Sequence, residues 1–96
     1  MLALRPNCEI CDQDLPPHAE GARICTFECT FCAACAEHKL HGMCPNCGGN
    51  LVPRPIRPHS KLARNPASTE RFLKPFDAAA HAERLARLGP LPPAER

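Results

Sequence analysis

The clearest periodic pattern of apolar residues in this 96-residue chain lies near its end. Four apolar residues recur there at helical spacing between charged ones: Ala78, Ala82, Leu85 and Leu88. The pattern predicts a helix over Ala78–Leu88, with Asp77 as N-cap and Gly89 at the stop. About three turns are too few to be stable alone in water. We therefore expect this helix to pack on the rest of the protein, to dock on a partner, or to fray.

Shorter signals predict the other elements. We expect a short β-hairpin around Ala22–Phe27 and a helix over Ala33–His41, with Leu40 facing the core. Asn65 followed by Pro66 is typical of a helix start, because Asn caps the first turn and Pro suits its first position. This predicts a further short helix that stops before Pro75.

Proline divides the chain into two parts. Eight of the twelve prolines follow residue 50, and the segment Leu51–Pro58 alone holds three of them. Each proline fixes its own φ and pushes its predecessor towards polyproline II, so this segment should be extended. It is either a linker or a strap across the first half, with Leu51, Val52 and Ile56 facing inwards. We thus predict a module over residues 1–50 and a Pro-rich basic extension over residues 51–96 with one or two short helices.

The chain is poor in large apolar side chains. It has no Trp, no Tyr and four Phe, of which Phe27 and Phe31 are the expected small core of the first half. A core of this size does not offset the conformational entropy of folding, and such small domains usually need disulfides or a metal.

Eight cysteines in the first half supply the missing cross-links. Six form C-x-x-C pairs, and Cys25 and Cys29 form a fourth, wider pair. The opening residues lack the apolar run of a secretory signal, and no stretch approaches the length of a membrane span. These features predict a cytoplasmic protein without a membrane partner, in which clustered thiols stay reduced and bind metal rather than forming disulfides or a redox centre.

Four thiolates complete a tetrahedral zinc shell, so eight cysteines predict two zinc ions. The ligand spacing, C-x2-C-x13-C-x3-C-x2-C-x2-C-x8-C-x2-C, allows two arrangements. In the sequential arrangement the first four cysteines bind one ion and the last four bind the other. In the interleaved arrangement pairs one and three share an ion, and pairs two and four share the other. The close spacing between Cys25 and Cys35 favours interleaving without deciding it.

The run Cys25-Thr-Phe-Glu-Cys-Thr-Phe-Cys-Ala-Ala-Cys35 resembles the middle of a RING finger. Ile10 inside the first pair and Pro45 inside the last are also typical of that fold. The resemblance covers about residues 6–50 and implies a small α+β cross-brace. In it one zinc binds Cys8, Cys11, Cys32 and Cys35, and the other binds Cys25, Cys29, Cys44 and Cys47.

The whole chain is similar to the domain of unknown function 1272 family of small bacterial cysteine-rich proteins. The likeness lies in the opening Leu4–Cys8, the central Phe27–Cys32, the closing Cys44–Gly49, and the later Asn65–Thr69. It implies a RING-like protein with two zinc ions and brings no known activity.

Other candidate ligands are His38 and His41, either of which could replace a cysteine, although eight thiols already satisfy two ions. His18 is expected to be exposed, and His59 and His81 carry no spacing signal. Catalytic zinc keeps an open coordination position, which two complete cysteine shells lack. We therefore expect no enzymatic activity.

The charge is uneven: residues 1–50 have a formal net charge of −3, and residues 51–96 have +5. The basic extension can neutralise the acidic module or contact nucleic acid. We favour a structural zinc protein that acts as a protein-interaction or adaptor module. The alternatives are a ubiquitin-ligase-like RING protein, for which a Trp between Cys35 and Cys44 is missing, and a nucleic-acid-associated zinc protein.

Overall fold

The sheet of this protein is small and has three strands. In the computed structural model, which describes residues 1–96, β1 (Ala22–Ile24) lies between β2 (Thr30–Cys32) and β3 (Val52–Pro53). Both pairings are antiparallel, with Ala22 opposite Cys32 and Ile24 opposite Val52. Pro53 lacks a backbone N–H, and it lies on the outer strand, where that loss costs least.

The predicted hairpin is present, but its predicted extent over Ala22–Phe27 is wrong. The first strand ends at Ile24, and the return strand begins only at Thr30. Between them the backbone of Cys25 accepts from Glu28 and donates to Cys29, which closes a turn with Glu28 at φ 66°. The C-x3-C pair therefore forms the turn itself, and the third strand was not predicted.

The predicted helix over Ala33–His41 is confirmed in a shorter form. The helix η1 (Cys35–Lys39) has wide turns of the π type, and its C-cap Leu40 is fully buried as expected. The core cluster of eleven buried residues draws its members from the sheet, from this helix and from the loops around them, and six of the eleven are cysteines. Apolar side chains from the rest of the chain, such as Ile10, Leu51 and Phe76, pack around it half-buried.

Of the two phenylalanines expected in the core, only Phe31 is there. Phe31 on β2 is 1% exposed, whereas Phe27 is 70% exposed and lies in the turn between β1 and β2. The prediction for Phe27 is wrong because the side chain lies at the turn and not on the inner face of a strand.

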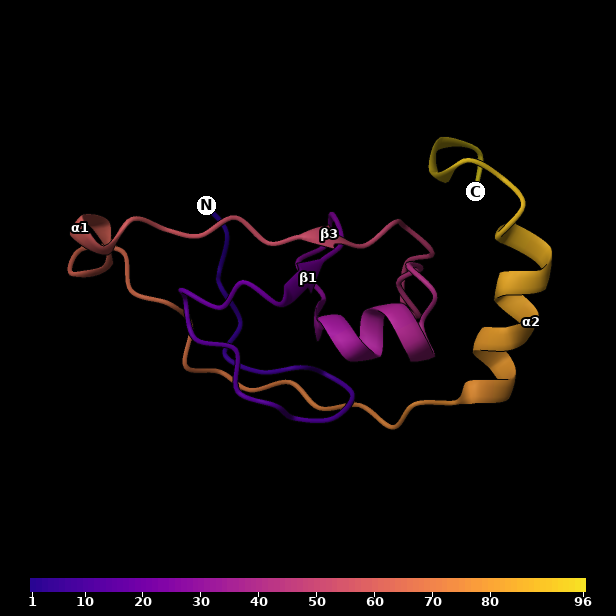
Figure 1. Cartoon of the computed structure of the whole chain (residues 1–96), viewed down its shortest axis with the longest axis horizontal. Helices are drawn as coiled ribbons and strands as arrows, with labels where there is room; N and C mark the ends of the chain where they lie inside the picture. The colour runs from indigo at the N-terminus through magenta and orange to yellow at the C-terminus, as the bar shows by residue number, and fades with distance from the viewer.

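The second half of the chain surrounds the first. After β3 the chain runs along one long side to the short helix α1 (His59–Leu62), returns along the opposite side, and ends in α2 (Ala78–Leu88) and η2 (Pro93–Glu95) (Figure 1). The resulting body measures 43 × 26 × 18 Å. No helix in it has both the length and the apolar character needed to span a membrane.

The helix predicted to start at Asn65-Pro66 and stop before Pro75 does not form. This segment is extended, and its backbone pairs with the first half: Ser68 N–H donates to Ala3 O at 2.8 Å, and Lys74 N–H donates to Glu9 O at 3.1 Å. Those tertiary hydrogen bonds replace the local ones that a helix would supply. The helix α1, which does form, was not predicted.

The helix over Ala78–Leu88 is confirmed, with the Asp77 carboxylate accepting from Ala80 N–H at 3.0 Å. The face it buries differs from the predicted stripe, since Ala78 and Ala82 are exposed. The buried face instead centres on His81 and includes the half-buried Leu85 and Leu88. Among the residues expected to face inwards from the proline-rich segment, Leu51 does so partly, while Val52 and Ile56 are exposed.

The two phenylalanines beside Cys29 provide a matched test of this core. Replacing Phe31 with Ala should lower the free energy of unfolding by about 3–5 kcal/mol, because it leaves a cavity at a fully buried position. Replacing Phe27 with Ala should change it by less than about 1 kcal/mol. Guanidinium unfolding of both variants measures the difference, and equal losses would contradict the placement.

Candidate metal centre

Two loops that hold cysteine pairs share one backbone pattern. In the first, Cys8 N–H donates to Gln13 O and Asp12 N–H donates to Cys8 O. The second repeats these bonds at the same spacing, since Cys44 N–H donates to Gly49 O and Gly48 N–H donates to Cys44 O. Each loop thus turns its two cysteines towards one side.

Both loops need a left-handed residue at the fifth position, counted from the first cysteine. Gly48 has φ 79° and Asp12 has φ 64°, values that glycine adopts freely and aspartate tolerates better than most residues. The next residue, Gly49, brings its backbone N–H to a thiol, since it donates to Cys47 Sγ at 3.4 Å. A side chain at Gly49 would come within 3.3 Å of that sulfur.

The first cysteine group combines the first loop with the end of β2. The Sγ atoms of four cysteines lie within 4.8 Å of one another: Cys8, Cys11, Cys32 and Cys35. Cys11 is exposed and the other three are buried. Cys32 ends β2 and Cys35 begins η1, so the sheet and the helix place this half of the group.

The second cysteine group combines the β1–β2 turn with the second loop. The Sγ atoms of Cys25, Cys44 and Cys47 lie within 4.8 Å of one another, and Cys47 is the exposed member. Cys29 lies buried beside this group, and Asn46 Nδ2 from the second loop donates to its sulfur at 3.5 Å. All eight cysteines predicted from the sequence therefore gather into two groups that could hold metal ions.

Burial and backbone hydrogen bonds act on these thiols in opposite directions. Burial raises the pKa of Cys25 to about 11 and raises the pKa values of Cys35 and Cys44 as well. Burial also tends to raise the pKa of Cys8, but hydrogen bonds from the backbone N–H groups of Cys11, Cys32 and Ile10 outweigh this effect and lower the pKa. The raised pKa values of Cys25, Cys35 and Cys44 favour the protonated thiol until a cation replaces the proton.

The donor set suits a soft divalent metal. Thiolate sulfurs select zinc or similar ions, whereas calcium and magnesium need oxygen ligands. Backbone N–H groups of Phe27, Cys35 and Asn46 donate to Cys25, Cys32 and Cys44 sulfurs at 3.3–3.4 Å. Such bonds disperse the negative charge of clustered thiolates.

Only one of the five histidines is buried, and the prediction that His18 is exposed is confirmed. His18, His38 and His41 are exposed, and none belongs to either cysteine group. His81, which carried no sequence signal, is 3% exposed, and its Nε2 lies 2.9 Å from Leu40 O. Since the carbonyl accepts, Nε2 donates, and the buried Nδ1 has no partner. This contact arises from the packing of α2 beside the end of η1, and no local sequence pattern predicts it.

Glu9 is the second residue that the sequence did not single out. This carboxylate between Cys8 and Cys11 is 3% exposed, accepts from Thr30 N–H, and pairs with Arg5 at 2.9 Å. It connects the first cysteine loop to β2, the strand that ends in Cys32. A charged residue in a sequence gives no sign that it will be buried.

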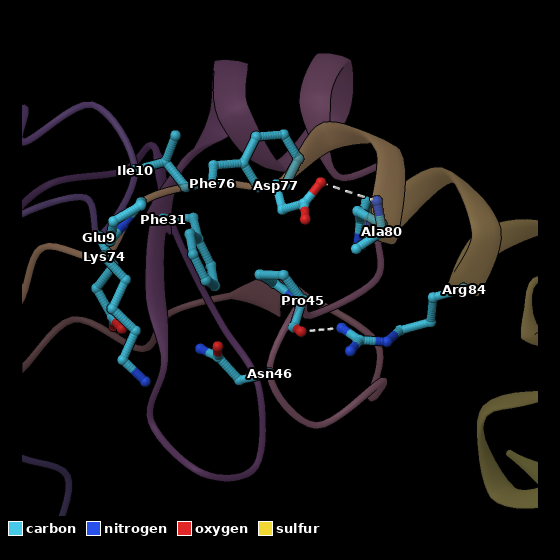
Figure 2. Close-up of a pocket in the computed structure, with 12 residues that line it drawn as sticks. Glu9, Ile10, Phe31, Pro45, Asn46, Lys74, Phe76, Asp77, Ala80 and Arg84 are labelled. Atoms are coloured by element: carbon cyan, nitrogen blue, oxygen red, sulfur yellow. Dashed lines mark hydrogen bonds between the residues drawn. The ribbon is translucent and has the colours of Figure 1, made fainter.

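A cavity of about 220 Å³ lies beside both cysteine loops. Figure 2 shows Ile10, Phe31, Phe76 and Pro45 around it, with Lys74 and Arg84 at its edge. Arg84 donates to Pro45 O, so α2 is attached to the second loop. The cavity is therefore formed jointly by the module and the extension.

Comparisons with known proteins identify relatives whose function is not known. A family model described as "Protein of unknown function (DUF1272)" matches residues 1–57. An uncharacterized protein of Rhizobium meliloti (strain 1021) is 71% identical over 79 residues, which cover 82% of this chain and 94% of the relative. No solved structure matches.

The contact between His81 and Leu40 predicts how α2 is held. Replacing His81 with Ala should speed amide hydrogen exchange in α2 about tenfold, because losing one buried hydrogen bond costs about 1.4 kcal/mol of local stability. Exchange in β1 and β2 should be unchanged. The matched variant His59→Ala, at an exposed position in α1, should leave α2 as protected as before. Unchanged exchange in His81→Ala would contradict the role of this contact.

Proposed function

The chain belongs to the DUF1272 family of proteins of unknown function, and we propose that it is a structural zinc protein that acts as a protein-interaction module. The observation that carries the proposal is the gathering of all eight cysteines into two groups. Each group offers four sulfurs, the number that a tetrahedral structural zinc site takes.

The two zinc sites are interleaved in this proposal. One zinc binds Cys8, Cys11, Cys32 and Cys35, and the other binds Cys25, Cys29, Cys44 and Cys47. The sulfur distances within each group support this cross-brace over the sequential arrangement. The β1–β2 hairpin then supplies ligands to both ions, since Cys25 and Cys29 lie in its turn and Cys32 ends its second strand.

The zinc ions stabilise structure and do not catalyse. Four thiolates leave no coordination position for water or substrate, which catalytic zinc requires. Six of the eight thiols are also buried, which limits access to the metals. The ions replace the large apolar core that this chain lacks.

The proline-rich segment acts as a strap across the module. Arg54 is 5% exposed and donates to three backbone carbonyls, those of Arg5, Leu15 and Pro16, at 2.8–3.1 Å. Burial without an acidic partner lowers its pKa, yet the guanidinium remains charged at neutral pH. Arg57 continues the strap by donating to Leu2 O.

Contacts of the basic residues within the chain argue against nucleic-acid binding. Five basic residues of the extension donate to groups of the first half: Arg54, Arg57, Arg71, Arg84 and Arg96. These side chains attach the extension to the first half. Their positive charges then lie beside the acidic module, which supports the interpretation that the extension neutralises it. A nucleic-acid surface would instead present them to phosphates.

Removal of zinc tests the proposal directly. The purified chain should contain two zinc ions, and titration with a strong chelator should abolish most of its far-ultraviolet circular dichroism, because site formation supplies much of the folding free energy. Re-addition of zinc should restore the signal. A near-native spectrum after complete zinc removal would contradict the structural role.

Paired cysteine variants test the interleaved arrangement. Cys11→Ser with Cys35→Ser removes two ligands of one proposed site, so the protein should retain about one zinc ion. Cys11→Ser with Cys29→Ser removes one ligand from each site and should lower affinity at both. The sequential arrangement gives the opposite result, because Cys11 and Cys29 then share an ion. Zinc content by mass spectrometry distinguishes the two.

A further inference from the structure

The buried side chain of Asn7 holds another part of the chain as a peptide ligand would be held. Its Nδ2 donates to Phe72 O at 2.7 Å, and its Oδ1 accepts from Phe72 N–H at 3.3 Å. One side-chain amide therefore satisfies both backbone groups of a residue 65 positions away. Lys74 N–H, two residues on, donates to Glu9 O at 3.1 Å. Pairing at every second residue is shared with a peptide added to a sheet edge, but here only the Lys74 bond joins two backbones and Phe72 is held by a side-chain amide.

Side chains add selectivity to this backbone pairing. The Arg5 guanidinium lies 4.2 Å from the centre of the Phe72 ring. Arg71 pairs with Asp12 and Asp14, at 2.9 Å in each case. We name the bound residues, Arg71–Phe76, the docking segment, and we name the residues that receive it the first-loop groove: Arg5, Asn7, Glu9, Ile10, Asp12 and Asp14.

The far end of the docking segment is fixed by Phe76. This ring packs half-buried against the core beside Ile10, and Figure 2 shows the two side chains next to each other above the cavity. Leu73, between the paired residues Phe72 and Lys74, is 58% exposed. The side chains of Phe72 and Phe76 are thus half-buried, while those of Leu73 and Lys74 are exposed.

We propose that the first-loop groove is a peptide-recognition site, which the docking segment fills within the same chain and which an extended segment of a partner protein takes in its place. The proposal rests on the proposed interaction function and names its site and partner class. The partner segment carries Arg directly before an aromatic residue and a second aromatic residue four positions later. Arg is required over Lys because the planar guanidinium reaches two carboxylates at once.

The docking segment is held loosely enough to be displaced. It has no helix or strand of its own, and its anchors Phe72 and Phe76 are only half-buried. The ion pairs of Arg71 are exposed, and such pairs contribute at most about 1 kcal/mol each. The helix α2 also contacts Leu40 through His81 and the second loop through Arg84, and these bonds can hold the helix when the segment opens and the ring contact between Phe76 and His81 is lost.

Peptide binding to the full-length, zinc-loaded chain tests the groove. The probe is a fluorescent synthetic peptide of residues 68–77, followed by anisotropy. Wild type should bind it weakly, because its own segment competes at a high effective concentration. Phe72→Ala in the protein weakens that competitor and should tighten peptide binding at least tenfold. Arg71→Ala is a milder second variant, with an expected gain of a few fold.

Matched controls separate recognition from loss of structure. Arg64→Ala removes an exposed cation just before the segment and should bind the peptide like wild type. A peptide carrying both Arg71→Glu and Phe72→Ala should bind Phe72→Ala protein at least tenfold more weakly than the native peptide. The groove proposal is contradicted if the folded Phe72→Ala and Arg71→Ala proteins bind the native peptide no better than wild type does. It is also contradicted if the native and the doubly substituted peptides bind Phe72→Ala protein equally well.

The zinc content and the oligomeric state of the chain distinguish a failure of the groove proposal from a failure of the proposed function. If the chain holds two zinc ions but does not bind the peptide, only the groove proposal is contradicted. If the chain is folded without zinc, the proposed structural zinc function is contradicted, and the peptide assay still tests the groove separately. A wild-type dimer that the peptide dissociates would assign the groove to a second copy of this chain, against an outside partner.

Discussion

The gathering of eight thiols into two groups is the constraint on which the rest of the structure depends. Six of the eleven residues in the core cluster are cysteines, and Phe31 is its one aromatic member. Apolar burial on this scale does not balance the entropy of ordering 96 residues. Buried thiols favour their neutral form, as the raised pKa of Cys25 shows, so a metal must displace protons to bind. In the proposed two-zinc protein, folding and metal binding are one equilibrium.

Buried polar groups connect the extension to this cysteine-rich core. Asn7, Arg54 and His81 are each at most 5% exposed, and each bonds backbone groups distant in sequence. A small sheet of three short strands leaves many loop carbonyls and amides that need partners. Side chains that reach across the molecule supply those partners. This explains how extended segments such as residues 64–77 are held without regular secondary structure.

Local sequence signals predicted correctly those elements whose formation depends on neighbouring residues. The helix Ala78–Leu88 formed within its predicted bounds, because its cap and stop residues act over a few positions. The helix expected after Asn65-Pro66 failed, because Asn7 and Glu9 offer the backbone of Phe72 and Lys74 better partners than a helix would. The buried face of α2 was also misjudged, since the groups that cover it come from η1 and the second cysteine loop.

The sequence by itself determined that the eight cysteines form four pairs, because the two members of each pair are only three or four residues apart. Only the tertiary structure decided which pairs meet, since that choice depends on the path of the β1–β2 hairpin and not on ligand spacing. The tertiary structure also decided the roles of His81 and Asn7. Their partners lie 41 and 65 residues away, and no local pattern records a contact closed over such a distance.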